Sequence, residues 1–518
     1  MNSIYSRPIL LILAMTALLQ GCSVNPVTGK NELSFMSQQQ EIALGSKNYS
    51  PSRQSQGGDY YLDPKLQAYV AGVGNKLAAV SDQPNLPYEF VVLNNSVPNA
   101  WALPGGKIAI NRGLLSYLDD ESQLAAVLAH EIVHAAARHG ASQMSRGTLA
   151  NIGLAAVAIG TQGRDGAQLY GLASQMGTAA WMAKYGRDDE LESDFYGMEY
   201  MARAGYEPQG AVELQRTFVK LSEGRQADFL SGLFASHPPS AKRVEANIAK
   251  AQKLPKGQRY RQRYQAAIAQ LRKDEPAYKA EEAALEALNK KQANVAINQL
   301  DRAIAVQPRE AAFWELRGHA WKLMDKTGNA EKAYSTAIRK NPKYFGPYLA
   351  RGALRYDLGD KARGLADIQR SYKILPTAKA SYYLGESAVE AKQYQAAIGY
   401  FKQASQAGGE LGKQSTQQLS ALQLELQPQS FISGSAGINS RGYVQVALSN
   451  RSPVPMTQIQ IRVDRMTSAY QVQSSQTFLI PQTIAAGTSL QLELGSAAVD
   501  TAQSPRFRVV VLAAKAIK

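Results

Sequence analysis

Two histidines and a glutamate in the stretch LAHEIVHAAARHG, residues 128–140, have the types and spacing of a metal site. His130 and His134 are four residues apart, so on a helix they are separated by about 40° and project from one face. Imidazoles placed in this way can both bind one Zn²⁺ ion. Glu131 can reach a water on the metal without being a ligand, as in the H-E-x-x-H arrangement of zinc peptidases. A histidine on an apolar helix is more often a core residue than a ligand, but this combination favours a catalytic helix.

A catalytic zinc ion normally takes three protein ligands, so one more ligand must come from elsewhere in the chain. His139 would lie about 180° around the same helix from His130, and we do not expect it to share that metal. The acidic segment RDDELESDFYG, residues 187–197, offers Glu190 and Asp194 on one face of a predicted helix. We expect Glu190 to ligate the ion and Asp194 to accept the ring N–H of a ligating histidine. Taken alone, the segment could also be a solvated helix face.

Four separated motifs resemble the metallopeptidase family that includes the CAAX prenyl proteases. They are HEIVH at 130–134 followed by E-x-x-x-D at 190–194, NAWALPGGKIAINRGLL at 99–115, SHPPSAKRV at 236–244, and NPVTGKNELSFMS at 25–37. The resemblance covers roughly residues 24–250. The repeats that follow are similar to those of the periplasmic BepA-like branch. That branch generally lacks a lipid anchor, however, and the single-domain lipoprotein members of the family lack repeats.

The resemblance implies a mainly helical, zincin-like domain with a small sheet and one Zn²⁺ per chain, held by His130, His134 and Glu190. Glu131 would take a proton from the metal-activated water and pass it to the leaving amine of a cleaved peptide bond. His237 or Arg243 would donate a hydrogen bond to the oxyanion. In BepA-like proteins the matching histidine can approach the zinc and hold the enzyme latent, so His237 is also a candidate latency ligand. Alternatively, the His-Pro-Pro sequence is only a rigid loop stop.

A strand is expected near Lys107–Asn111, along the active-site cleft, where an extended substrate could pair with its edge. The residues that would border this cleft are Asn99, Ala100, Trp101, Gly105 and Gly106. Pro104 and the two glycines could equally form an ordinary turn.

The N-terminus has the pattern of a lipoprotein signal peptide, residues 1–21. Arg7 is followed by a largely apolar run from Ile9 to Leu19, which is too short to span a bilayer comfortably. The small Gly21 precedes Cys22, the only cysteine, which we expect to be lipidated as the first residue of the mature chain. Because Ser23, rather than Asp, follows it, resemblance to sorted lipoproteins predicts the outer membrane. Residues 22–36 are interpreted as a tether, and the protein would face the periplasm without spanning the membrane.

Downstream of the expected peptidase domain (37–256) and a helical linker (257–275), the sequence becomes repetitive. Pro308, Pro342 and Pro376 recur at 34-residue intervals, the period of tetratricopeptide helical hairpins. About four repeats are predicted over 276–426, in a solenoid whose concave face could bind protein segments. The alternative is that the repeats only make the molecule rigid.

Helical patterns end near residue 427, and alternating apolar segments follow up to residue 518. These segments are YVQVALSN (443–450), QIQIRVDR (458–465), SLQLELG (489–495) and FRVVVLAA (507–514). They predict a small β-sandwich without a catalytic constellation, which would serve in interaction or capping.

Composition limits the possible functions further. A chain of 518 residues with 45% hydrophobic content is too long for one core. The net charge of +15 is spread along the chain, without a basic block that would indicate nucleic-acid binding.

Together, the motifs, the resemblance and the repeats predict a zinc endopeptidase of the cell envelope that degrades misfolded or misassembled outer-membrane or periplasmic proteins recruited by its repeats. The outer-membrane assembly machinery is a possible partner. The alternative is a repeat-based assembly factor or chaperone scaffold with minor or latent proteolysis.

Overall fold

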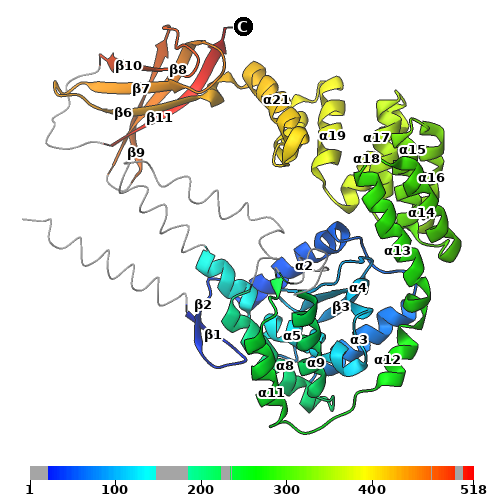
Figure 1. Ribbon diagram of the computed structural model, residues 1–518. Helices are drawn as coiled ribbons and strands as arrows, with labels where there is room; N and C mark the ends of the chain where they lie inside the picture. Colours follow the sequence, from blue (N-terminus) through cyan, green and yellow to red (C-terminus); the bar gives the residue numbers. More distant parts are fainter. Residues whose placement is uncertain are drawn as a thin grey trace, which may run out of the picture. The chain divides into compact units, whose positions relative to one another are not determined.

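Helices make up most of the protein, as predicted, and the chain divides into two units, Met1–Arg351 and Gly352–Lys518 (Figure 1). The computed structural model describes residues 22–147, 185–222, 234, 236–467, 470–495 and 506–517. The predicted signal peptide, residues 1–21, lies outside the described residues. Among the described helices, none is both long and apolar enough to cross a membrane.

A three-stranded sheet lies at the centre of the N-terminal region of unit 1. Its strands are β3 (Glu89–Leu93), β4 (Ala100–Leu103) and β5 (Lys107–Asn111), in the order β3-β5-β4. Strand β5 pairs in parallel with β3 and antiparallel with β4. The expectation that β5 offers a free edge was therefore wrong. Because a tight turn folds β4 back onto β5, β5 is the central strand, and β4 and β3 form the two edges.

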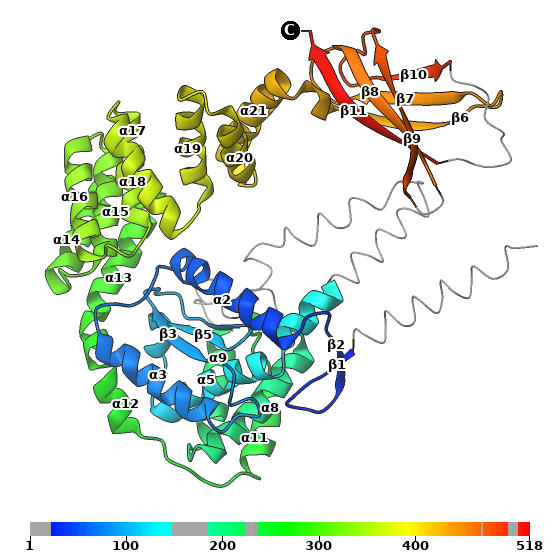
Figure 2. The same ribbon diagram turned by 180° about the vertical axis from the view of Figure 1, so that it is seen from behind.

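Helices cover both faces of this sheet (Figure 2). The helix α2 (Gln38–Ser55) packs on one face, where Tyr49 meets side chains of all three strands. The helices α3 (Pro64–Ala78) and α5 (Glu121–Ala136) contribute to the larger core on the other face. Alternate residues of each strand point to the two sides, as the pleat of a β-strand requires. The α2 side receives Val91, Leu93, Trp101, Leu103 and Ala109, and the α5 side receives Val92, Ala100, Ala102, Ile108 and Ile110.

The helix α5 carries the HEIVH motif and is buried along its whole length. It begins after Asp120, whose carboxylate accepts hydrogen bonds from the backbone N–H groups of Ser122 and Gln123 at 3.1 and 3.2 Å. It ends at Ala136, because Arg138 adopts a left-handed conformation with φ of 62°. Residues 139–147 are helical again. The break therefore separates His139 from the helix that carries His130 and His134.

The helices α8 (Arg187–Arg203) and α9 (Gln209–Ser222) pack against α5, and α11 (Ala241–Ala251) packs against both of them. The acidic segment forms the start of α8, which packs closely against α5. A Cβ atom on Gly197 would lie 3.2 Å from the backbone nitrogen of His130. A side chain at this position would therefore push the two helices apart.

Residues 22–36, interpreted as a tether, contain an antiparallel hairpin. It is formed by β1 (Cys22–Val24) and β2 (Asn31–Leu33). Its turn is closed by a hydrogen bond from the Gly29 N–H to the Asn25 carbonyl at 2.8 Å, with φ of 70° at Gly29. We refer to residues 22–33 as the N-terminal hairpin.

Four consecutive helical hairpins lie within the continuously described stretch 236–467. In chain order, after α12 (Arg261–Ala267), they are α13 (Ala269–Asn289) with α14 (Ala293–Val306), α15 (Ala311–Leu323) with α16 (Thr327–Lys340), α17 (Gly346–Asp357) with α18 (Lys361–Ile374), and α19 (Ala378–Glu390) with α20 (Tyr394–Ala404). The helix α21 (Gly409–Leu426) follows. Each of the three prolines at 34-residue intervals lies just after the second helix of a hairpin, where a helix cannot continue.

Small residues explain why the helices within a hairpin approach so closely. In unit 1, a Cβ atom on Gly318 would lie 2.4 Å from the ring of Tyr334 in the partner helix. In unit 2, Gly385 stands in the same relation to the ring of Phe401. Both rings are fully buried. Each of these two hairpins therefore has a small residue facing a buried ring, as close packing of a tetratricopeptide-type hairpin requires.

Within unit 1, the first repeats are joined to the N-terminal region by buried polar contacts. Glu310, at the start of α15, accepts hydrogen bonds from the Asn94 side-chain amide at 3.1 and 3.0 Å. Arg112, in the short helix α4 (Arg112–Leu115) after β5, pairs with Glu281 of α13 at 3.3 Å. The first repeats, α13 to α16, are thus packed onto the domain that carries the HEIVH helix.

In unit 2, two antiparallel three-stranded sheets share one apolar core after the short helix η3 (Pro428–Phe431). Their strands are β6 (Ile432–Ile438), β7 (Val444–Asn450), β8 (Met456–Met466), β9 (Val472–Ile480), β10 (Ser489–Leu494) and β11 (Arg506–Ala516). The strand orders are β10-β7-β6 and β11-β8-β9. Strands β6 and β9 are additions to the four segments that the sequence indicated.

Candidate metal centre

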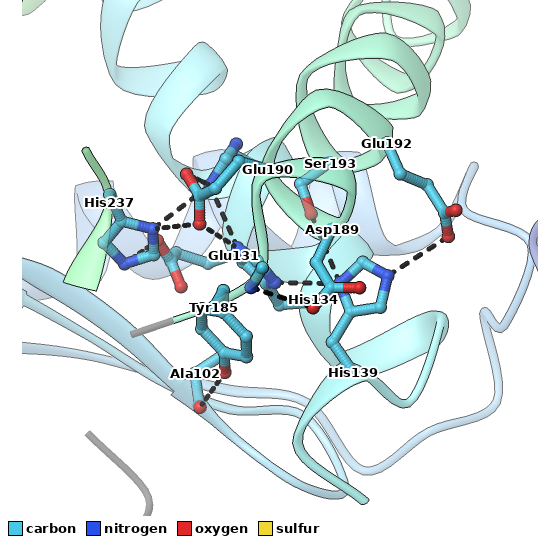
Figure 3. A network of polar contacts seen from close by, with 12 residues as sticks. Ala102, Glu131, His134, His139, Tyr185, Asp189, Glu190, Glu192, Ser193 and His237 are labelled. Carbon is cyan, nitrogen blue, oxygen red and sulfur yellow. Dashed lines mark hydrogen bonds and ion pairs between the residues drawn. The ribbon is translucent and has the colours of Figure 1, made fainter. Parts of the chain in front are cut away.

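Four buried side chains converge on one point between α5 and α8 (Figure 3). They are His130 and His134 of α5, Glu190 of α8, and His237, which precedes α11. One ligand atom from each lies within 4.8 Å of the others. Glu190 and His237, which follow His134 by 56 and 103 residues in the sequence, are therefore brought to the HEIVH motif.

The spacing of these atoms fits a tetrahedral metal ion. An ion with donors at about 2.1 Å would hold neighbouring donors about 3.4 Å apart. The Nε2 atoms of His130 and His134 are 3.0 Å apart, and His134 Nε2 lies 3.4 Å from Glu190 Oε1. His237 Nδ1 lies 3.3 Å from His130 Nε2 and 3.1 Å from Glu190 Oε1. The donor set of two or three imidazoles and one carboxylate suits zinc and related divalent ions.

Behind His130 lies a charged pair. Asp194 Oδ1 is 2.9 Å from His130 Nδ1, so the opposite ring atom, Nε2, faces the centre. Arg243 donates to both oxygens of Asp194 at 2.7 Å. Burial raises the pKa of Asp194, but the charge and hydrogen bonds of Arg243 outweigh burial and lower it. Asp194 is therefore ionised and holds the His130 ring in one orientation.

Arg243 also contacts Glu190, with its NH1 atom 2.7 Å from Glu190 Oε2. A further hydrogen bond goes from NH1 to the Pro238 carbonyl at 3.3 Å. The guanidinium group is thus committed to two carboxylates and a carbonyl. This arrangement gives Arg243 a positioning role and leaves His237 as the stronger candidate for direct contact with a substrate.

Behind His134 lies a longer relay of hydrogen-bonded side chains. His134 Nδ1 is 2.9 Å from His139 Nδ1, and His139 Nε2 is 3.1 Å from Glu192 Oε1. The ring of His134 also stacks on Tyr185, with centroids 3.8 Å apart and planes at 16°. Burial lowers the pKa of His134 well below its usual value. This imidazole is therefore neutral, as a metal ligand must be.

Glu131 lies beside the four metal-binding side chains. Among the described residues, Glu131 Oε2 and His237 Nε2 are both buried without a hydrogen-bond partner. Glu131 Oε1 is 3.5 Å from His237 Nε2. Burial raises the pKa of Glu131. A buried carboxylate with an unpaired oxygen and a raised pKa is suited to accept and return a proton.

The five residues expected to border the cleft have separate positions. Ala100 lines a mostly apolar pocket beside His130 and Glu131, with Met198, Met201, Leu214 and Phe218 among its other walls. Asn99 accepts a backbone hydrogen bond from Asn111 at 2.8 Å. Trp101 points to the opposite face of the sheet, against Tyr49. Gly105 and Gly106 form the β4–β5 turn, with φ of 76° and 82°.

Three residues of the centre were not found from the sequence: His139, Tyr185 and Glu192. A helical wheel continued through residue 139 placed His139 on the far side, but the break at Arg138 redirects it. Tyr185 donates a hydrogen bond to the Ala102 carbonyl of the edge strand at 3.4 Å. Only Glu192 carried a signal, because it belongs to the acidic segment that contains Glu190 and Asp194.

Comparison with known proteins agrees with this geometry. The model of peptidase family M48 matches residues 64–250. Metalloprotease YcaL of Escherichia coli (strain K12) is 30% identical over 205 residues, which cover 39% of this chain and 73% of that protein. The chain belongs to peptidase family M48. Its M48 domain contains all four converging side chains.

The M48 match covers only part of other relatives. The beta-barrel assembly-enhancing protease of Yersinia pestis is 31% identical over 197 residues, 37% of this chain and 40% of that protein. This chain thus matches less than half of that relative's length. Among solved structures, the Arabidopsis OM64 TPR domain is similar with a TM-score of 0.22 and 23% identity, covering 23% of this chain and 98% of that chain.

Proposed function

We propose that this M48 protein is a zinc-dependent endopeptidase. The observation that carries the proposal is the convergence of His130, His134 and Glu190 beside the unpaired carboxylate oxygen of Glu131. When bound, zinc supplies Lewis-acid polarisation and lowers the pKa of water towards neutrality. Family membership supports peptide bonds as the target.

In the proposed mechanism, the chain's own residues orient the reactants and move the proton. Glu131 accepts a proton from the attacking water and delivers it to the nitrogen of the leaving amine. Asp194 and Arg243 keep the His130 ring fixed during this exchange. The apolar pocket next to Glu131 is suited to one apolar side chain of the substrate, because methionine, leucine and phenylalanine line it.

His237 is proposed to act as a latch in the resting enzyme. Its Nδ1 atom lies at the fourth donor position, which a substrate or water must occupy during hydrolysis. We expect substrate binding to displace this ring, after which its N–H can donate to the oxyanion. Replacing His237 would therefore remove the latch and an auxiliary donor together.

The natural setting is proposed to be the bacterial cell envelope, at the periplasmic face of the outer membrane, with a lipid on Cys22. Its substrates would be misfolded or misassembled envelope proteins that the repeats recruit. This proposal is supported by the lipoprotein pattern at residues 1–22 and by the beta-barrel assembly-enhancing proteases among the relatives. Membrane fractionation of wild type and Cys22→Ser tests the anchor. Loss of the membrane-bound fraction in the variant is expected, and an unchanged fraction contradicts the anchor.

The deciding experiment measures zinc content and degradation of an unfolded protein with the full-length chain in detergent. Wild type is compared with Glu131→Gln and His237→Ala. We expect one zinc per chain in wild type and Glu131→Gln, cleavage abolished only in Glu131→Gln, and faster basal cleavage in His237→Ala. Absence of zinc from wild type contradicts the proposed function. Zinc without cleavage by wild type or His237→Ala favours an assembly scaffold built on the repeats.

A further inference from the structure

The N-terminal hairpin is connected to a metal ligand through an unbroken chain of side chains. His134 Nδ1 contacts His139 Nδ1 at 2.9 Å, and His139 Nε2 contacts Glu192 Oε1 at 3.1 Å. The same Glu192 oxygen accepts a hydrogen bond from the Asn25 side-chain amide at 2.9 Å. Two of these contacts appear in Figure 3. Asn25, three residues after Cys22, thus contacts Glu192, which supports His134 through His139.

If His134 binds a metal through Nε2, the donor and acceptor of each hydrogen bond in this chain of contacts can be assigned in a single consistent way. His134 Nδ1 then carries the proton and donates it to His139 Nδ1. His139 must in turn carry its own proton on Nε2, which it donates to Glu192. The carboxylate completes the chain as an acceptor from both His139 and Asn25. Each donor is matched with an acceptor, so the orientation of His134 is coupled to the position of Glu192.

Asn25 occupies the end of this chain and also builds the hairpin turn. Its Oδ1 accepts hydrogen bonds from the backbone N–H groups of Val27 and Thr28 at 2.9 and 3.2 Å. Its amide group donates to Glu32 of β2 at 2.7 Å as well as to Glu192. The residue is 2% exposed. One side chain therefore ties the shape of the hairpin to the carboxylate behind the metal ligand.

Other contacts dock the hairpin, through Ser23 and Glu32, and the residues that follow it onto the segment after α5. Arg138, at the helix break, donates to Ser23, Met36 and Glu41. Ser142 donates to the second Glu32 oxygen at 2.7 Å, and the Phe35 N–H donates to Ser145 at 3.0 Å. The hairpin thus lies against the same short segment that places His139. Docking of the hairpin and the position of His139 therefore depend on the same segment.

We propose that the N-terminal hairpin is part of the metal centre, with His139, Glu192 and Asn25 as positioning residues that fix the His134 ring. The inference rests on the metal site of the proposed function and adds to it a requirement for the first residues of the described chain. Retention of the metal depends on the docked hairpin. If Cys22 carries a lipid, the outermost residue of this support, Asn25, lies three positions from the membrane attachment point in the sequence.

The test measures the dissociation constant for Zn²⁺ on the full-length chain in detergent, by competition with a chelator. Two variants break the relay without removing bulk. Glu192→Gln removes the carboxylate charge at the same size. Asn25→Asp keeps the acceptor that builds the turn but replaces the donor with an oxygen that faces two carboxylates. Thr28→Ala is the matched control, because Thr28 lies in the same turn and its hydroxyl has, among the described residues, a hydrogen bond only with the Lys30 N–H.

We expect Glu192→Gln and Asn25→Asp each to weaken Zn²⁺ binding about 10-fold, the size typical for outer-shell partners of metal ligands. Thr28→Ala should stay within about 2-fold of wild type. In chain loaded with Co²⁺, the visible absorption bands should shift in the two relay variants and not in the control, since these bands report ligand geometry. A merely structural role would lower thermal stability without moving the bands.

Equal Zn²⁺ affinity and unchanged bands in both relay variants would overturn the inference and leave the proposed function intact. Weaker binding in all three variants would also overturn it, because the control does not touch the relay. Weaker binding confined to the relay variants, in a chain that cleaves no protein, would uphold the inference and contradict the proposed function. A wild-type chain that binds no Zn²⁺ would overturn both.

Discussion

The two histidines of the HEIVH motif are held in opposite ways. His130 is backed by Asp194 and Arg243, an ion pair buried between α8 and α11. His134 is backed by another imidazole, His139, and then by Glu192 at the edge where the N-terminal hairpin docks. The first support is charged, short and formed inside the domain. The second is longer, starts with an imidazole instead of a carboxylate and depends on a segment that is far from the helix in the sequence.

This difference indicates that the two ligands serve the centre differently. A carboxylate behind a histidine raises the basicity of the ring and fixes it strongly. A neutral imidazole fixes the ring with less charge. We therefore expect His130 to contribute most of the stability of the centre, and His134 to be the ligand through which changes at the N-terminus reach the metal.

The largest effect is expected when both supports are removed together. Asp194 and Glu192 lie two residues apart on α8 and serve different histidines, so their contributions to metal binding should be independent. Asp194→Asn with Glu192→Gln should weaken Zn²⁺ binding about 1000-fold, the product of about 100-fold and 10-fold losses. Chelator competition on wild type, the two single variants and the double variant measures these dissociation constants. A double variant no weaker than Asp194→Asn would mean that the supports act as one unit.

The support of His130 alone accounts for the next largest effect. Asp194→Asn should weaken Zn²⁺ binding about 100-fold and lower the free energy of unfolding by about 3 kcal/mol, because Arg243 loses a buried partner. Urea denaturation measures the second quantity. The matched control is Asp367→Asn, which breaks a similar contact to Arg355 at 2.9 Å in the repeats of unit 2. An equal loss of Zn²⁺ affinity in the control would contradict a local role for Asp194.

The geometry of the ion pair can be tested more gently. Arg243→Lys keeps the charge but removes the two parallel hydrogen bonds to Asp194, so Zn²⁺ binding should weaken about 10-fold. Arg259→Lys is the control, because Arg259 makes the same two-point contact with Glu213 at 2.7 and 2.6 Å, away from the centre. If both variants bind Zn²⁺ like wild type, the charge of Arg243 alone positions Asp194.

The same contrast shows how far the sequence could predict the centre. Spacing within a regular helix brings Glu190 and Asp194 to one face, and the structure has both residues at the centre. His139 escaped this reasoning because a single left-handed residue, Arg138, ends α5 before it. Asn25 lies 109 residues before His134 in the chain, and only tertiary docking of the hairpin brings it near. Local periodicity thus reaches contacts within one helix but not those that cross a helix break.

The parts of the fold also differ in how far the sequence could predict them. The repeats were predictable because prolines recur at 34-residue intervals, each just after the second helix of a hairpin. In unit 2, β7 and β8 alternate apolar residues and were indicated, whereas β6 (ISGSAGI) is rich in glycine and serine and β9 (VQSSQTFLI) is largely exposed. The order of β4 and β5 could not be read from either strand, because both are fully buried in unit 1.

The smallest effect is expected at Tyr185, the other neighbour of His134. Its ring stacks on the imidazole, while its hydroxyl donates a 3.4 Å hydrogen bond to the Ala102 carbonyl of the edge strand. Tyr185→Phe keeps the stacked ring and loses one weak hydrogen bond, so Zn²⁺ affinity should change less than about 3-fold and stability by about 1 kcal/mol. Tyr185→Ala, which removes the ring, should weaken Zn²⁺ binding further.

If Tyr185→Phe weakens Zn²⁺ binding as much as Glu192→Gln does, then His134 is oriented through the edge strand rather than through His139. A substrate that pairs with β4 would in that case disturb the metal ligand directly, and the two histidines would differ in their link to the substrate rather than to the N-terminus.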